Sequence, residues 1–170
     1  MSHQVIDDFL PETEFTTLQN FLMKTGIYTT IPFTYRDNWQ DSIDDFSLQA
    51  NLRFFPSLVE PLWEQYKAQD ILICRANVLM RRDQNHIGGF HTDFIDRPDI
   101  TTSVLYINDC NGGTAFEDGG FVESKANRAV IFNNTVSHAG VWQTDTSFRY
   151  VVNTNFVGEE SFREKFWSPL

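Results

Sequence analysis

A histidine and an aspartate separated by one residue, His91 and Asp93, are the residues whose types and spacing most directly suggest chemistry. On an extended strand alternate side chains point to the same face, with Cα atoms roughly 6.5 Å apart, so both could bind one first-row metal ion. Gly88 and Gly89 precede the pair and are typical of a turn that leads into it. A third ligand would have to come from elsewhere, and the chain offers His138.

An arginine follows the second histidine and could hold an anionic co-substrate: Arg149 lies eleven residues after His138. The runs 136–142 and 148–153 look like two strands joined by the polar residues 143–146. If this connection is a four-residue hairpin loop, Arg149 lies on the sheet face of His138, roughly 7 Å further along the strand. A three- or five-residue loop would turn Arg149 to the opposite face, so the loop length tests this geometry.

The four residues together suggest one kind of site. Two neutral imidazoles and one carboxylate on one face of a ferrous ion leave adjacent positions open for a chelating 2-oxo acid and for O₂. A guanidinium roughly 7 Å away suits the far end of a five-carbon diacid, because it can form a bidentate salt bridge. A His-x-Asp pair is a weak signal by itself. His138 and Arg149 therefore carry the prediction of an iron site with a 2-oxoglutarate anchor.

Helical patterns occur only in the first 70 residues, after a short predicted strand at 5–9. Pro11 suits the first turn of a helix, and apolar residues at helical spacing over 15–22 predict a stripe that faces the core. A Ser-x-x-Glu capping box at 57–60 predicts a second amphipathic helix that ends near Lys67.

The segment 26–50 has no clear periodicity and is rich in aromatic residues. An irregular segment of this length in a compact domain is either a functional lid or a loop packed down by its own rings. The sequence leaves both interpretations open.

After Asp70 the pattern changes to β. Short runs of Val, Ile, Phe, Tyr and Thr alternate with polar or glycine turns, which favours a mostly β sandwich or jelly roll with the N-terminal helices packed on one face. A single domain is expected over 1–170, with residues 1–70 as helical support and lid and 71–157 as the β core. The predicted strands are 71–80, 101–108, 114–117, 120–124, 128–132 and 148–157.

The bulk composition disfavours some classes of partner. The chain has 170 residues, 41% of them hydrophobic and 15% aromatic, which is enough for one bulky core. Its net charge of −10 makes a nucleic-acid partner unlikely. The absence of a signal-like N-terminus or a long apolar run predicts no membrane association and a cytoplasmic protein. Cys74 and Cys110 fit reduced thiols, one in the core and one in a turn.

Residues 75–157 resemble the catalytic core of the Fe(II)/2-oxoglutarate-dependent oxygenases, in particular the prolyl 4-hydroxylase-like group. The resemblance implies a double-stranded β-helix with iron on His91, Asp93 and His138 and with 2-oxoglutarate on Arg149. It also implies that Tyr106 donates its hydroxyl to a 2-oxoglutarate carboxylate. The matching segments are 77–79, 90–94, 101–108, 112–118, 126–132 and 138–155.

The sequence departs from this family in one part of the co-substrate pocket. Relatives often carry a second tyrosine at the position of Leu79, so one hydrogen bond to 2-oxoglutarate is either missing or supplied by Asn77. Asn153 shares the strand face of Arg149 and either lines the pocket or satisfies a strand end.

The resemblance implies that 2-oxoglutarate is decarboxylated to succinate and CO₂ while O₂ is used to hydroxylate a C–H bond. Substrate contacts are expected from residues 26–50 and from the loop 95–100 that follows the metal pair. The candidate residues there and beside the pair are Arg36, Trp39, Arg81, Arg82 and Arg97.

The leading hypothesis is a dioxygenase that hydroxylates a protein or peptide side chain. The alternatives are a small-metabolite hydroxylase and a non-catalytic metal-binding jelly-roll module. A zinc hydrolase is disfavoured because no His-Glu-x-x-His helix is present. Nucleobase repair ranks low because of the acidic charge balance.

Overall fold

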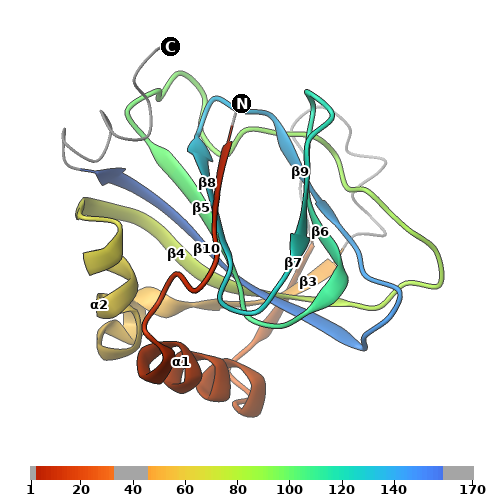
Figure 1. Cartoon of the computed structure of the whole chain (residues 1–170), viewed down its shortest axis with the longest axis horizontal. Helices are drawn as coiled ribbons and strands as arrows, with labels where there is room; N and C mark the ends of the chain where they lie inside the picture. Colours follow the sequence, from red (N-terminus) through yellow and green to blue (C-terminus); the bar gives the residue numbers. More distant parts are fainter. Residues whose placement is uncertain (1–2, 33–45, 159–170) are drawn as a thin grey trace.

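The computed structural model describes residues 3–32 and 46–158, which form two antiparallel sheets and two α-helices (Figure 1). Apart from β2 and β3, the strands agree with the predicted runs to within a few residues at most ends. The elements are β1 (His3–Ile6), α1 (Glu12–Lys24), β2 (Thr29–Pro32), β3 (Phe46–Asn51), the 3-10 helix η1 (Leu52–Phe54), α2 (Pro56–Gln65), β4 (Ala68–Met80), β5 (Thr101–Tyr106), β6 (Cys110–Phe116), β7 (Phe121–Ser124), β8 (Ala129–Asn133), β9 (His138–Val141) and β10 (Phe148–Gly158).

The two sheets face each other, as in a jelly roll, so the predicted mostly β fold class is confirmed (Figure 1). The large sheet has the strand order β1-β8-β5-β10-β4-β3-β2, and the small sheet has the order β7-β6-β9. Two isolated antiparallel bridges, Ile87 to Val141 and His91 to His138, place residues 87–91 beside β9. This segment extends the small sheet on the side where the predicted metal ligands lie.

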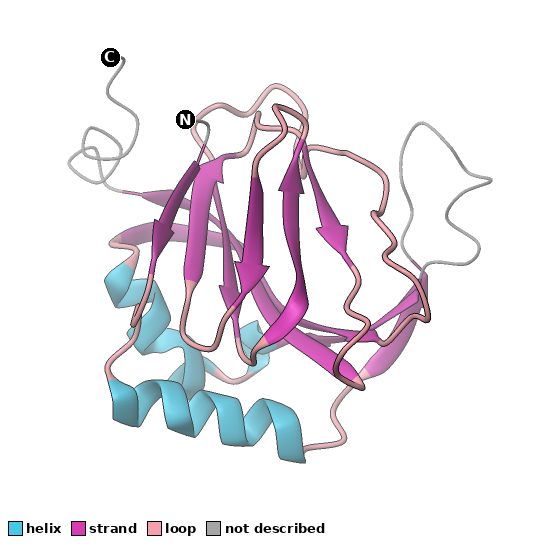
Figure 2. Cartoon of the chain, turned by 45° about the vertical axis from the view of Figure 1, so that its right-hand side comes forward, coloured by secondary structure: helices cyan, strands magenta, loops and turns pink. Residues whose placement is uncertain are grey.

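The large sheet has a helix-covered face and an interior face. On the first, a core cluster joins the α1 stripe Phe15, Leu18 and Leu22 to Val59 and Leu62 of α2 and to alternate residues of β4, β5, β8 and β10. Figure 2 shows both helices on the same side of the strands. Neither helix in the described part of the chain is long and apolar enough to cross a membrane.

The interior face lies between the two sheets and has a smaller apolar cluster. It joins Val104 and Tyr106 of β5 to Phe116 of β6, Val122 of β7 and Val151 of β10, with two residues of β8. The cluster fills one part of the interior. The rest of that face carries the polar side chains described below.

The second helix begins differently from the sequence prediction. The predicted capping box at 57–60 is not formed: the N-cap is Phe55, no side chain caps the helix, and Pro56 occupies its first turn. Proline is favoured there because its missing N–H would have no helical partner and its φ is already helical. Ser57 and Glu60 therefore lie inside the helix.

The prediction of an irregular segment at 26–50 is wrong at both ends. β2 and β3 pair there as antiparallel strands, with Thr29 opposite Gln49, and β3 continues the large sheet beside β4. Residues 33–45 lie outside the described part, so the lid remains a prediction. Cys110, expected in a turn, is buried in β6, whereas Cys74 is buried in the core as expected.

Candidate metal centre and co-substrate pocket

His91 and His138 are held side by side by their own backbones. The N–H of each donates to the C=O of the other at 3.0 Å, which makes them a hydrogen-bonded antiparallel pair. Directly opposite residues on neighbouring strands project from the same face. Their ring centroids accordingly lie 4.7 Å apart.

Both imidazoles are oriented by the carbonyl two residues before them. Nδ1 of His91 lies 2.9 Å from the carbonyl oxygen of Gly89, and Nδ1 of His138 lies 3.1 Å from that of Val136. A carbonyl oxygen can only accept, so Nδ1 of each ring carries the proton and Nε2 keeps its lone pair. This is the arrangement in which a histidine binds a metal through Nε2.

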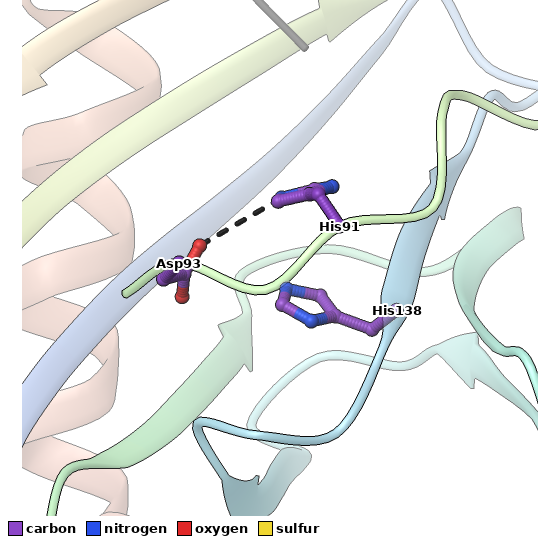
Figure 3. Close-up of side chains that lie close together, drawn as sticks. All are labelled: His91, Asp93 and His138. Atoms are coloured by element: carbon purple, nitrogen blue, oxygen red, sulfur yellow. Dashed lines mark ion pairs between the residues drawn. The ribbon is translucent and has the colours of Figure 1, made fainter. Parts of the chain in front are cut away.

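Asp93 completes the group from a bend in the chain (Figure 3). One ligand atom from each of His91, Asp93 and His138 lies within 4.8 Å of the others, and Oδ1 of Asp93 is 3.7 Å from Nε2 of His91. The expectation that the pair shares an extended strand is wrong, because strand pairing stops at His91. Asn134 holds the bend instead: its Oδ1 accepts from the N–H of Phe94, and its Nδ2 donates to the carbonyl of the same residue.

The second carboxylate oxygen of Asp93 is bound from the large sheet. Nδ2 of Asn155 on β10 donates to Oδ2 of Asp93 at 2.7 Å and also lies 2.9 Å from the hydroxyl of Thr102. That hydroxyl is itself 3.3 Å from Oδ2. Oδ1 is thereby left for a metal, and the donor set of two imidazole nitrogens and one carboxylate oxygen fits Fe(II).

The electrostatics keep the ligands in the forms that bind metal. Burial raises the pKa of Asp93, but the charges of His138, His91 and Arg75 and the hydrogen bond from Asn155 together hold it below its usual value. Burial lowers the pKa of His138 more than the Asp93 carboxylate raises it. A charged carboxylate and a neutral imidazole at His138 are the forms expected at neutral pH.

Asn155→Ala is expected to weaken Fe(II) binding by about 10–100-fold, the usual effect of removing a group that orients a metal ligand. The alanine leaves Oδ2 of Asp93 with only the longer contact to Thr102, so the carboxylate can rotate away from the histidines. Anaerobic Fe(II) titration measures the change. Asn133→Ala is a matched control, because Asn133 binds the carbonyl of Pro98 outside the metal group. Equal affinity in Asn155→Ala and the wild type would contradict the assigned role of Asn155.

Arg149 reaches the interior, although the hairpin that predicted it does not exist. β9 belongs to the small sheet and β10 to the large sheet, so residues 142–147 cross between the sheets and do not form a tight turn. The Arg149 side chain is 3% exposed, and a Cβ added to Gly140 would lie 3.4 Å from its Nη2. The guanidinium thus extends from the large sheet to the backbone of β9.

The Arg149 guanidinium is deeply desolvated. Burial lowers its pKa, although the group stays charged because an arginine holds its proton far above neutral pH. Its buried Nε has no hydrogen-bond partner among the described residues. A buried, unpaired cation is costly in free energy, so a ligand anion is the expected partner.

Tyr106, Asn77 and Asn153 also lie on the interior face. Tyr106 is fully buried, and its hydroxyl lies 2.8 Å from Oγ1 of Thr114 and 3.1 Å from the carbonyl of Val122; burial raises its pKa to about 12. Asn77 and Tyr106 both stand opposite Val151, the inward residue two positions from Arg149. The Oδ1 atoms of Asn77 and Asn153 are buried and have no hydrogen-bond partner within residues 3–32 and 46–158.

The five expected substrate residues are not brought to one place in the described structure. Arg36 and Trp39 lie outside the described residues. Arg97 is exposed and forms a bidentate ion pair with Asp99. Arg81 and Arg82 line an open hollow of about 470 Å³ with residues 83–86, and the Arg82 guanidinium lies 5.0 Å above the Trp142 ring.

Asn155 and Arg75 were missed in the sequence, as were Asn134 and Thr102, which contact the bend and the carboxylate of Asp93. Alternate residues of a strand point to the same face, and Asn155 is two residues after Asn153 and six after Arg149 on β10. This alternation would have placed Asn155 on the interior face. Arg75 could have been found in the same way from Asn77. His86, five residues before His91, is not part of the metal group; the centroids of its ring and the Trp142 ring lie 4.9 Å apart.

The two-sheet fold is that of the Fe(II)/2-oxoglutarate oxygenases. A prolyl hydroxylase from Trichoplax adhaerens, in complex with a peptide fragment of the hypoxia inducible factor oxygen degradation domain, matches at a TM-score of 0.62 and 16% identity, over 99% of this chain and 88% of its own. A Pseudomonas putida prolyl-4-hydroxylase matches with a TM-score of 0.62 and 16% sequence identity, over 93% of each chain. The epimerase SnoN in complex with Fe³⁺, α-ketoglutarate and nogalamycin RO matches with a TM-score of 0.64 and 8% sequence identity. The match covers 92% of this chain and 79% of SnoN.

The sequence itself matches no protein-family model and no curated protein. The identities to the solved structures are low enough that the likeness concerns the fold. What this chain binds and does must therefore be argued from its own residues.

Proposed function

We propose that this protein is an Fe(II)- and 2-oxoglutarate-dependent dioxygenase that hydroxylates a C–H bond of a second substrate. One observation carries the proposal: two Nε2 atoms and one carboxylate oxygen converge on the interior face, and a buried arginine without a hydrogen bond at Nε lies in the same interior. A structural neighbour with the same fold, SnoN, contains Fe³⁺ and α-ketoglutarate.

The residues have separate tasks in this proposal. His91, His138 and Asp93 would bind iron, which together with O₂ would supply the oxidative decarboxylation of 2-oxoglutarate and the oxidation of the substrate. Arg149 would bind the far carboxylate of 2-oxoglutarate with a bidentate pair of N–H donors. Tyr106 and Asn77 would bind the co-substrate between Arg149 and the metal, and Asn153 would line the same interior. Phe116, Phe132 and Val151 are buried together on the interior face and would help to exclude water from the bound co-substrate.

The leading proposal for the substrate is a protein or peptide side chain. Ile87, Phe90 and Ile95 flank the metal-binding residues in the chain and are all exposed, so the rim of the site offers apolar surface to a partner. A structural neighbour binds a peptide. A small metabolite is the second candidate, favoured by Arg75, a further interior arginine discussed below.

A non-catalytic jelly-roll module that binds a metal for structural reasons is the alternative outside the enzymes. It would need the three ligands, but it would have no use for Arg149. A buried guanidinium of this kind is destabilising unless it is neutralised by a bound anion. The arginine therefore favours the enzyme.

The proposal is tested by anaerobic titration of the full chain with Fe(II) and then 2-oxoglutarate, followed by admission of O₂ and measurement of succinate. The expected result is one Fe(II) per chain, binding of 2-oxoglutarate that depends on the metal, and slow succinate release even without the second substrate. Binding of Fe(II) without 2-oxoglutarate would support the non-catalytic module and reject the dioxygenase.

A further inference from the structure

A second arginine faces the interior beside the metal ligands. Arg75 on β4 stands opposite Asn153 of β10, and its guanidinium is close enough to Asp93 to influence that carboxylate. Arg75 is partly buried, its Nε is fully enclosed, and no hydrogen bond or ion pair joins its side chain to another described residue. Nothing in the proposed iron and 2-oxoglutarate chemistry requires this cation.

The strand register separates Arg75 from the co-substrate anchor. Along the interior face of β10 the residues run Arg149, Val151, Asn153 and Asn155, and Asn155 binds Asp93. Arg75 is therefore level with the metal end of the interior, while Arg149 lies four residues away, or roughly 13 Å along the strand. The far carboxylate of a 2-oxoglutarate that reaches from the metal to Arg149 would bind Arg149, so Arg75 is not needed at that end.

The charges of the loaded site support a second anion. Fe(II) and Arg149 together carry three positive charges, which Asp93 and doubly charged 2-oxoglutarate balance. Arg75 then adds one positive charge in a partly dry interior, where an unpaired charge is unfavourable. A singly charged anion would balance it, whereas a phosphate dianion would leave an excess of negative charge beside Asp93.

We propose that Arg75 binds a carboxylate of the second substrate and so places the C–H bond beside the metal. The guanidinium fork matches a carboxylate in two parallel hydrogen bonds. Asn153 lies directly across from Arg75, and its unpartnered buried Oδ1 can accept an N–H from the same molecule. The inference rests on the proposed function. It narrows the substrate to a carboxylic acid, either a free small acid or an acidic group of a peptide.

The test compares acids with their uncharged amides. The wild-type chain is loaded anaerobically with Fe(II) and 2-oxoglutarate, and binding is measured by calorimetry with the twenty L-amino acids and C3–C6 monocarboxylates, each beside its primary amide. A second arm uses Asp- and Glu-containing peptides with blocked ends beside their Asn and Gln forms. A third arm uses inorganic phosphate. Succinate release after admission of O₂ is the second readout.

The expected result is at least one acid that binds about 10–100-fold tighter than its amide, the range for a hydrogen-bonded charged group, and that accelerates succinate release. In Arg75→Gln the ratio of the acid affinity to the amide affinity falls to about one. The affinity of this variant for 2-oxoglutarate stays within about threefold of the wild-type value. Retained 2-oxoglutarate binding shows that the variant is folded. Arg53→Gln is the control, because it removes an exposed arginine whose guanidinium binds the carbonyl of Leu72 within the described residues, and it should keep the preference.

Several results would overturn the inference. These are no preference for any acid, a preference that survives Arg75→Gln, or phosphate binding that depends on Arg75. If Arg75→Gln weakens 2-oxoglutarate binding as much as a change at Arg149, Arg75 is a co-substrate anchor and the inference is wrong. Failure of the proposed function is separate, since the wild type would then not bind Fe(II) and 2-oxoglutarate at all.

Discussion

Asp93→Ala is expected to weaken Fe(II) binding by more than about 100-fold, beyond the effect of losing an orienting neighbour, and to abolish succinate formation. The carboxylate is the one anionic ligand of the three. Without it two neutral imidazoles remain, and their rings still lie side by side because their backbones stay paired. Anaerobic Fe(II) titration measures the affinity, and the imidazole pair makes weak residual binding the expected outcome.

The control for this variant is Asp70→Ala, which removes an exposed carboxylate on β4, outside the metal group. It should bind Fe(II) as the wild type does. Asp93→Ala should also stay folded, because the alanine removes the buried charge together with its need for a partner. Wild-type Fe(II) affinity in Asp93→Ala would exclude Asp93 as a ligand.

Arg149→Leu is expected to change two properties in opposite directions. The affinity for 2-oxoglutarate should fall by about 2–5 kcal/mol, because the co-substrate carboxylate would be buried without its cation. The ligand-free chain should at the same time become more stable by about 1–3 kcal/mol, because an unpaired buried guanidinium is replaced by an apolar side chain beside Leu79. Calorimetry measures the first change, and urea unfolding without ligand measures the second.

Arg149→Lys is the matched variant. It keeps the charge but loses the planar fork, so its affinity for 2-oxoglutarate should lie between those of Arg149→Leu and the wild type. The assignment of Arg149 as the co-substrate anchor would be wrong if the leucine variant bound 2-oxoglutarate normally. A leucine variant that was less stable without ligand would show that Arg149 has a structural partner.

The residues of the candidate site could be predicted from the sequence more readily than the way the fold brings them together. His91, His138 and Arg149 were chosen by type and spacing, and the structure places all three in the interior. The hairpin predicted between His138 and Arg149 does not form, and the polarity and length of residues 143–146 do not say whether the chain turns within one sheet or crosses to another. Arg149 still faces inward because strand parity inside β10 does not depend on how the chain reaches it.

Other features depended on contacts distant in the sequence. The bend at Asp93 is held by Asn134, about forty residues away, and no local sequence pattern predicts this contact. The capping box at 57–60 failed because Pro56 determined the start of the helix. β2 and β3 were missed because their pairing partners, not their own composition, make them strands.

Two sheets contribute to the proposed metal and co-substrate site, since His138 belongs to the small sheet and Arg149 to the large one. A 2-oxoglutarate that is bound to the metal at one end and to Arg149 at the other would connect the sheets as a removable crosslink. Separation of the sheets would then require release of the co-substrate, so the cooperativity of unfolding would be linked to its concentration. The abundance of a common metabolite would thus help to set how long the folded protein survives.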